Sequence, residues 1–263
     1  MRSRVTILEV NNLTKTYPGG KPVLRGVSLR VDEGSVTGFI GLNGAGKTTT
    51  IRIIAGLLSA DAGSIRISGK EVQAGDPEYK RGLGFVLDEP LYLDWMEPGE
   101  YLRFVGLMYG LSTRDAERRT DELLEFFDLG GKRGDLIKTL STGMKKKVSL
   151  AAAVIHKPRI LVLDEPLEGI DALAARAVRD ALTMMVDGGM TVLITSHVLS
   201  AIEKLCTHVA VIHHGRIILQ GRTAEVKREA LSSSRSGDQE QSLEDLFIDL
   251  VSPHTQKKPF SYF

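Results

Sequence analysis

Short apolar runs rich in β-branched residues alternate along the chain with longer segments whose apolar residues recur at helical spacing. The runs predicted to form strands are Thr37–Ile40, Gly84–Leu87, Ile160–Asp164 and Thr191–Thr195. Helical stripes lie within segments 51–58 and 174–185, where apolar residues recur at the i, i+3, i+4, i+7 spacing of one helix face. This alternation is typical of an α/β domain with a largely parallel sheet.

Between Asp88 and Ile155 the strand signals stop, while apolar residues keep a helical spacing. Examples are Ala116, Leu123, Leu124 and Phe127, then Val148, Ala151, Ala152 and Ile155. We therefore expect a helical subdomain over about residues 89–156.

The C-terminal part of the chain combines a hairpin pattern with a polar extension. The segment VAVIHHGRIILQG predicts two strands around a turn at His214–Gly215. The two histidines His213 and His214 could bind a metal, but neighbouring strand residues point to opposite faces, which favours a turn role. Beyond Glu229 we expect a polar linker, a short helix at Leu243–Val251 and a frayed tail. The predicted domains are 1–228 and the extension 229–263.

Composition narrows the possible function classes. The net charge of +1 and the lack of a dense basic stripe disfavour nucleic-acid binding. The single cysteine, Cys206, cannot form an intramolecular disulfide, and the N-terminus has no long apolar core, which together favour a cytoplasmic setting. No segment approaches the roughly 20 apolar residues of a membrane-spanning helix. We therefore expect no direct membrane span in this chain.

Glycines cluster directly after the first predicted central strand, in GLNGAGKTT. The segment Gly41–Thr48 matches GxxxxGK[ST] and lies between a strand and an amphipathic helix. Such a loop turns backbone amides toward phosphates at a helix N-terminus; the alternative is a glycine-rich turn with a solvent-exposed lysine. Lys47 would reach the terminal phosphates, and Thr48 would offer its hydroxyl to Mg²⁺. The predicted nucleotide contacts are Asn43, Gly44, Ala45, Gly46, Lys47, Thr48 and Thr49.

Two carboxylates, Asp164 and Glu165, end the apolar strand ILVL. This places them at the carboxyl edge of the sheet, where α/β proteins bind ligands. Asp164 is predicted to hold Mg²⁺ through water, and Glu165 to act as general base for an attacking water. The alternative is a pair of surface acids at a strand end.

The segment LSTGM, residues 140–144, precedes LVLDEP and resembles the signature segment of the ATP-binding subunits of ABC transporters. The resemblance covers roughly Val5 to Arg222. It implies a P-loop NTPase core with a mostly parallel sheet, antiparallel β elements at the N-terminal side and a helical subdomain. It also implies a head-to-tail dimer with a second ATP-binding subunit, the same or different, enclosing two ATP molecules.

The same resemblance assigns roles to further residues. Tyr17 would stack on adenine, and Asp171 would belong to the D-loop. His197 would contact the γ-phosphate and, with Glu165, orient the water. The alternatives are that Tyr17 only packs against its neighbours and that His197 only ends its strand. Ser141 can cap the following helix, so that its N-terminus and Gly143 offer donors to the partner's ATP. Lysines Lys145–Lys147 either favour that anion or form a solvated face.

Three features depart from the family pattern. Thr142 and Met144 replace the third and fifth residues of the usual LSGGQ, and Thr142 must then keep a negative φ to avoid strain. Asp88 stands where a glutamine normally links the metal to the membrane partner; it is predicted as a metal ligand, or alternatively as a cap of the helical subdomain. We expect Leu91–Met96 to be a docking surface for a transmembrane subunit, or else to be buried inside the helical subdomain.

The predicted function is therefore ATP hydrolysis, with ATP and Mg²⁺ bound, that powers transport by separate transmembrane permease subunits at the cytoplasmic face of the membrane. The SxGM form resembles exporters. The alternatives are an ATP-binding regulatory module with weak hydrolysis, an ABC-type ATPase acting on ribosomes or DNA, and a metabolic kinase.

Overall fold

The structure, a computed structural model, describes residues 5–72, 76–88, 92–196, 203–233 and 247. Its larger sheet has the strand order β10-β9-β3-β8-β7-β6. In chain order these strands are β3 (Val36–Ile40), β6 (Leu83–Val86), β7 (Ile160–Leu163), β8 (Thr191–Ser196), β9 (His208–His213) and β10 (Arg216–Arg222). All neighbours pair in parallel except β9 and β10, which form the predicted antiparallel hairpin.

A second sheet is antiparallel, and its strands come both before and after β3 in the chain. It has the order β2-β1-β4-β5. Its strands are β1 (Thr6–Thr16), β2 (Pro22–Asp32), β4 (Ala62–Ile67) and β5 (Lys70–Glu71). The predicted fold class, α/β with a mostly parallel sheet and N-terminal antiparallel strands, is confirmed.

Burial explains why the central strands are nearly continuous apolar runs. Every residue of β3, β7 and β8 is buried, as expected for parallel strands covered on both faces. The edge strand β10 instead alternates exposed and half-buried residues. Parallel pairing aligns the carboxyl ends of β6, β7, β8 and β3 at one edge, and the phosphate loop and the acidic pair both follow strands at that edge.

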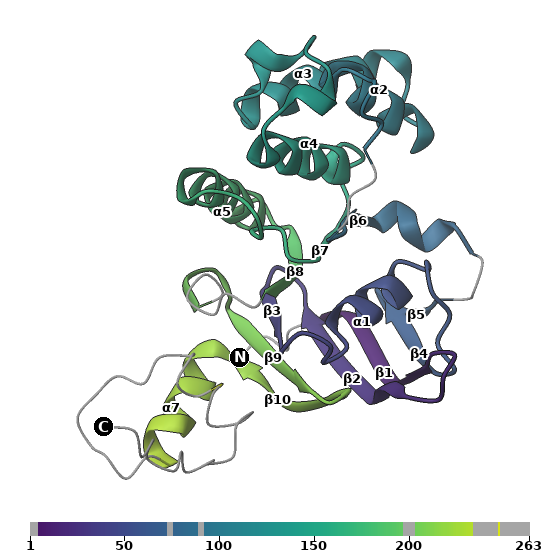
Figure 1. Cartoon of the computed structure of the whole chain (residues 1–263), viewed down its shortest axis with the longest axis vertical. Helices are drawn as coiled ribbons and strands as arrows, with labels where there is room; N and C mark the ends of the chain where they lie inside the picture. The colour runs from purple at the N-terminus through teal and green to yellow at the C-terminus, as the bar shows by residue number, and fades with distance from the viewer. Residues whose placement is uncertain (1–4, 73–75, 89–91, 197–202, 234–246, 248–263) are drawn as a thin grey trace, which may run out of the picture.

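The helices divide into those on the sheets and those of the helical subdomain. The chain forms α1 (Lys47–Ile54), α2 (Pro98–Met108), α3 (Thr113–Phe126), α4 (Thr142–Val154), α5 (Ala172–Asp187) and α7 (Thr223–Ser233), with short 3-10 helices at 78–82, 130–132 and 137–139. Figure 1 shows α2, α3 and α4 together at one end of the molecule, beyond β6 and β7. No helix in the described part of the chain is long and apolar enough to cross a membrane.

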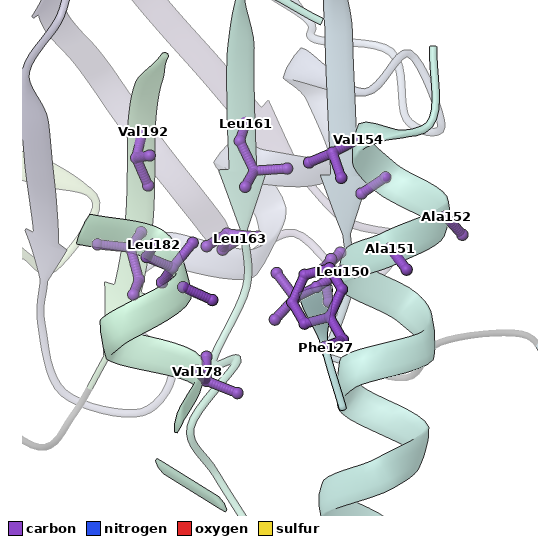
Figure 2. Packing of buried hydrophobic residues seen from close by; sticks show 14 of the residues in the cluster. Phe127, Leu150, Ala151, Ala152, Val154, Leu161, Leu163, Val178, Leu182 and Val192 are labelled. Atoms are coloured by element: carbon purple, nitrogen blue, oxygen red, sulfur yellow. The ribbon is translucent and has the colours of Figure 1, made fainter. Parts of the chain in front are cut away.

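The helical subdomain is joined to the sheet by a shared apolar core. Leu150 and Val154 of α4 face Leu161 and Leu163 of β7, with Leu182 of α5 on the other side (Figure 2). Helix α4 also approaches β6 closely, because a Cβ at Gly84 would lie 2.1 Å from the carbonyl oxygen of Ala153. This packing fixes α4 against the strands that carry the acidic residues.

Two local predictions were wrong. The helical stripe was expected to continue to Leu58, but α1 ends at Ile54 because Gly56 turns the chain with a φ of +65°. His213 and His214 do not point to opposite faces: their ring centroids are 4.0 Å apart, because His214 lies in the turn with a φ of +46° and the strand alternation has ended. The described residues contain no group of three or more potential ligands placed to hold a metal.

Other predictions fall outside the described residues. The rest of the predicted linker, the helix Leu243–Val251 and the C-terminal tail lie there, apart from Phe247, which packs half-buried against the main apolar core. The linker was expected to begin directly beyond Glu229, and this is wrong, because α7 continues to Ser233. The division into residues 1–228 and 229–263 stays a prediction.

Candidate functional site

The phosphate loop connects β3 to α1, and its geometry requires glycine at several positions. Gly44 and Gly46 have φ values of +78° and +116°, a region that L side chains rarely adopt. Gly41 has no room for a side chain, since a Cβ there would lie 2.6 Å from the carbonyl oxygen of Ile212 on β9. Gly46 is also the N-cap of α1, whose first turn contains no acidic residue. The loop therefore presents the positive end of a helix without a competing carboxylate of its own.

Lys47 and Glu165 face each other in the buried part of the site. The Lys47 ammonium donates to the carbonyl oxygen of Gly41 at 2.7 Å and lies 3.5 Å from Glu165 Oε1. Only 6% of the Lys47 side chain and 9% of the Glu165 side chain are exposed, so each charge is compensated by the other rather than by solvent. The predicted phosphate-binding cation and the predicted general base thus belong to one site.

Thr195 of β8 links the two acidic residues. Its hydroxyl donates to Asp164 Oδ1 at 2.6 Å and accepts from the backbone N–H of Glu165 at 2.9 Å. The other carboxylate oxygen, Asp164 Oδ2, is buried and has no hydrogen-bond partner in the described part of the chain. An unpaired buried carboxylate oxygen is costly, and a hard cation would satisfy it. The chemistry of Asp164 therefore fits a magnesium ion.

A cavity of about 300 Å³ connects the loop with the acidic side of the site. Its lining includes Asn43, Gly44, Gly46, Lys47, Thr48 and Thr49 on one side and Asp88, Glu165 and Glu168 on the other. Asp88 therefore faces the nucleotide loop. The alternative that it caps the helical subdomain is wrong, because Glu97 is the N-cap of α2 and forms a capping box with Glu100.

Two predicted nucleotide contacts lie beside this cavity rather than in its lining. Ala45 is buried, and its backbone bonds to Leu42 and Gly215 help to shape the loop. Tyr17 is 37% exposed, and its hydroxyl is 3.5 Å from Thr49 Oγ1, next to the start of α1. Asp164 lies deeper, with 1% of its surface exposed.

The signature segment occupies the N-terminus of α4. Ser141 caps this helix, as expected, because its Oγ accepts from Met144 N at 3.3 Å. Thr142 is the first helical residue and avoids positive φ, so its β-branched side chain is accommodated. Gly143 is required by packing, since a Cβ there would lie 2.8 Å from Ala174 Cβ on α5.

Asp171 caps the neighbouring helix α5 by accepting from the backbone N–H groups of Leu173 and Ala174, both at 2.9 Å. The described lining of the cavity does not include Ser141, Gly143 or Asp171. Within one chain, the structure therefore does not bring these three residues to the phosphate loop. His197, the remaining predicted site residue, lies outside the described residues.

The segment Leu91–Met96 was predicted either to form a docking surface or to be buried in the helical subdomain, and its described residues show both exposure and burial. Leu91 lies outside the described residues, and Tyr92 and Met96 pack half-buried against the main core. Trp95, in contrast, is 70% exposed. Asp94 lies 3.6 Å from Lys145, so this segment is also tied to α4.

Sequence reasoning missed Thr195, Glu168 and Lys146 as parts of this site. Lys146 is buried rather than solvated and donates to the carbonyl oxygen of Glu165 at 3.3 Å. The sequence did contain a signal for the burial of Lys146. The run VSLAAAVI, which begins at Val148 on the same helix, is apolar on nearly all sides and predicts a helix that is buried all round.

Comparisons with known proteins agree with this geometry. Residues 24–168 match the ABC transporter family. The chain is 35% identical over 220 residues to the linearmycin resistance ATP-binding protein LnrL of Bacillus subtilis, covering 84% of this chain and 70% of that protein. It is 36% identical over 234 residues to the Nod factor export ATP-binding protein I of Rhizobium etli, covering 88% and 72% of the two chains.

A solved structure described as the ATP-binding subunit of an ABC transporter superposes with a TM-score of 0.82 at 32% identity. The superposition covers 93% of this chain and 99% of that one. The family match, the relatives and the phosphate loop facing an acidic pair all lead to the same assignment: the chain belongs to the ATP-binding subunits of ABC transporters.

Proposed function

We propose that this subunit hydrolyses ATP as a head-to-tail dimer and thereby powers export through separate transmembrane permease subunits. The observation that carries the proposal is the buried pairing of Lys47 with Glu165, 3.5 Å apart, in a cavity bounded by the phosphate loop. A phosphate-binding cation and a carboxylate base are the two groups that hydrolysis of a phosphoanhydride needs within reach of each other.

Each residue of the site has a role in this mechanism. Residues 43–49 hold the phosphates through backbone amides and Lys47, while Tyr17 contacts adenine. Thr48, Asp164 and Asp88 are the oxygen-bearing residues that would hold Mg²⁺, which would supply positive charge to the phosphates.

Glu165 takes the proton of the attacking water. Lys47, which lies beside Glu165 in the structure, contacts the phosphates when ATP is bound and then gives up part of its contact with Glu165. His197 orients the water in this proposal. General-base catalysis of this kind contributes typically about 10²–10⁴-fold to the rate.

The dimer is supported by the residues that do not reach the cavity of their own chain. Ser141 and Gly143 lie at the N-terminus of α4, where helix amides favour an anion. A second subunit that presents these amides and Asp171 to the open side of the cavity would complete the site.

The membrane partner is proposed to dock on the helical subdomain near Trp95, which is 70% exposed and belongs to the aromatic type that is enriched at interfaces. The protein would then lie at the cytoplasmic face of the membrane and cross it only through its partners. Export is favoured because one relative is named for Nod factor export and another for resistance to linearmycin. Nucleic acid is not expected as a partner, since the net charge is only +1.

A regulatory ATP-binding module with weak hydrolysis is the second candidate function. The observation that favours it is Asp88, which adds a carboxylate to a cavity already lined by Glu165 and Glu168. Extra negative charge beside the phosphates would oppose the binding of ATP unless a cation compensates it.

The deciding experiment compares wild type with Glu165→Gln and Ser141→Arg, with Glu122→Gln on the exposed side of α3 as a matched carboxylate control. Hydrolysis is followed by phosphate release, and dimerisation by sedimentation, both with Mg²⁺ and ATP. The proposal expects Glu165→Gln to lose at least about 10²-fold in turnover and to accumulate an ATP-bound dimer. Ser141→Arg should bind ATP without dimerising. Wild type that binds ATP but neither dimerises nor hydrolyses it, with partner membranes present, would favour the regulatory module.

A further inference from the structure

Lys146 is a buried lysine that the nucleotide mechanism above does not use. It lies on α4 and is only 7% exposed, whereas its neighbours Lys145 and Lys147 are half-buried. Lysine is almost never this buried unless a partner compensates its charge, because removing an ammonium from water is costly. A specific contact is therefore expected to keep it there.

That contact is the backbone of the proposed general base. The Lys146 ammonium donates to the carbonyl oxygen of Glu165 at 3.3 Å. The acidic groups that face Lys146 are Asp88, Glu168, Asp164 and Glu165, and they favour its charged form. Burial opposes them and lowers the pKa of Lys146 from its usual value.

The backbone of Glu165 is in a conformation that needs support. Its φ is +48°, the left-handed region that a non-glycine residue rarely occupies and that costs on the order of 1 kcal/mol or more. Its N–H donates to Thr195 Oγ1 on β8. Its carbonyl oxygen accepts from Glu168 N within the same turn at 3.2 Å and from Lys146. Lys146 is thus the contact from α4 that fixes the carbonyl side of this residue.

We propose that Lys146 is a positioning residue for ATP hydrolysis: by donating to the carbonyl oxygen of Glu165, it holds that residue in its left-handed conformation and aims the carboxylate into the nucleotide cavity. The proposal rests on the function proposed above, since it assigns Lys146 a role through Glu165. Helix α4 also begins at Ser141, so the helix that would contact the partner's ATP directly contacts the general base of its own chain.

The test compares Lys146→Met and Lys146→Arg with Lys147→Met as control. Lys147 lies on the same helix, and the structure gives it no hydrogen bond or ion pair among the described residues. Methionine is unbranched like lysine, one atom shorter, and removes the donor. We expect Lys146→Met to lose about 10-fold or more in kcat, the range of one hydrogen bond to a charged group, with KM for ATP changed by less than about 3-fold. Lys146→Arg should keep kcat within about 5-fold of wild type, because it retains a charged donor.

A double-mutant cycle separates positioning from a general loss of structure. In a Glu165→Gln background, Lys146→Met should reduce the residual single-turnover rate by less than about 2-fold, because the carboxylate that it positions is already gone. A loss as large as that in wild type would overturn the proposal, and so would a folded Lys146→Met with wild-type kcat. Should Lys146→Met not fold, Lys146→Leu, which also lacks a hydrogen-bond donor, is used under the same criteria.

A readout that is independent of hydrolysis distinguishes failure of this inference from failure of the proposed function. Amide hydrogen exchange over residues 163–168, measured without nucleotide, should accelerate several-fold in Lys146→Met and not in Lys147→Met, because the turn loses its contact with α4. Unchanged exchange overturns the positioning contact even in an active enzyme. If exchange accelerates in Lys146→Met while the wild-type protein does not hydrolyse ATP, the contact stands and the proposed catalytic function is rejected instead.

Discussion

Replacing Thr195 with valine should weaken both the fold and the hydrolytic site, because one hydroxyl holds two groups of that site. Thr195 is fully buried on β8. Its hydroxyl donates to Asp164 Oδ1 at 2.6 Å and accepts from Glu165 N at 2.9 Å. Valine has nearly the same shape but can form neither bond. The change therefore leaves a buried carboxylate oxygen and a buried amide unpaired.

The magnitude follows from these two contacts. A hydrogen bond to a charged group contributes about 1.5–3 kcal/mol, and a buried amide left unpaired costs about 1–3 kcal/mol. We expect Thr195→Val to lower the free energy of unfolding by roughly 2.5–6 kcal/mol. At about 2–4 °C per kcal/mol for a chain of this size, the Tm should fall by roughly 5–24 °C.

The assay is thermal unfolding followed by circular dichroism, with the ATPase rate measured well below the lower Tm. Thr195→Ser is the matched control, since it keeps the hydroxyl and loses one methyl group, worth about 1 kcal/mol. We expect the serine variant to stay close to wild type in kcat and the valine variant to lose at least about 10-fold, because both Asp164 and the Glu165 backbone become free to shift. If Thr195→Val unfolds at the same temperature as Thr195→Ser and hydrolyses ATP as fast, the bridging role of the hydroxyl is refuted.

Two further predictions concern packing and thiol chemistry. Gly84→Ala should lower the free energy of unfolding in urea by about 1–3 kcal/mol, because the new Cβ would lie 2.1 Å from a backbone oxygen of α4. Gly82→Ala, where no atom lies within 4 Å of the new Cβ, is the control, and equal free energies of unfolding for the two variants would contradict the close approach. Cys206 is 6% exposed and burial raises the pKa of its thiol, so little thiolate forms at pH 8. Its alkylation by iodoacetamide should be at least about 10-fold slower in native protein than in denaturant, and similar rates would show that the site opens readily.

Local patterns were enough to predict the strands of the central sheet and the loop that follows one of them. A buried parallel strand needs an uninterrupted apolar run, so β7 and β8 are visible in the sequence within a residue or so. The glycines of the phosphate loop are required by positive φ and by contact with β9, and both requirements restrict the sequence strongly. Ser141 was predicted as a helix cap because a cap depends only on the residues next to it, whereas Asp171 was named through the family resemblance and its capping of α5 was not predicted.

The burial of Lys146 could not be found in the same way. Three consecutive lysines resemble a solvated helix face, and only the tertiary packing of α4 against β6 and α5 turns the middle one toward Glu165. Asp88 is similar, since it lines the cavity only because β6 is placed so that its end lies near the phosphate loop and Glu165. Both cases depend on which elements are neighbours in space, and the local pattern contains no such information.

Strand order is the step that turns separate motifs into one site. The phosphate loop follows β3 and the acidic pair follows β7, and these strands do not touch; β8 lies between them and pairs with both. A short polar side chain near the end of β8 is therefore placed to contact groups from the β7 side, as Thr195 does. The sequence showed each strand but not their order, so the residue on the intervening strand was passed over. In a doubly covered parallel sheet, a buried hydroxyl near the carboxyl end of such an intervening strand is accordingly a candidate for holding the acidic groups that follow the neighbouring strand.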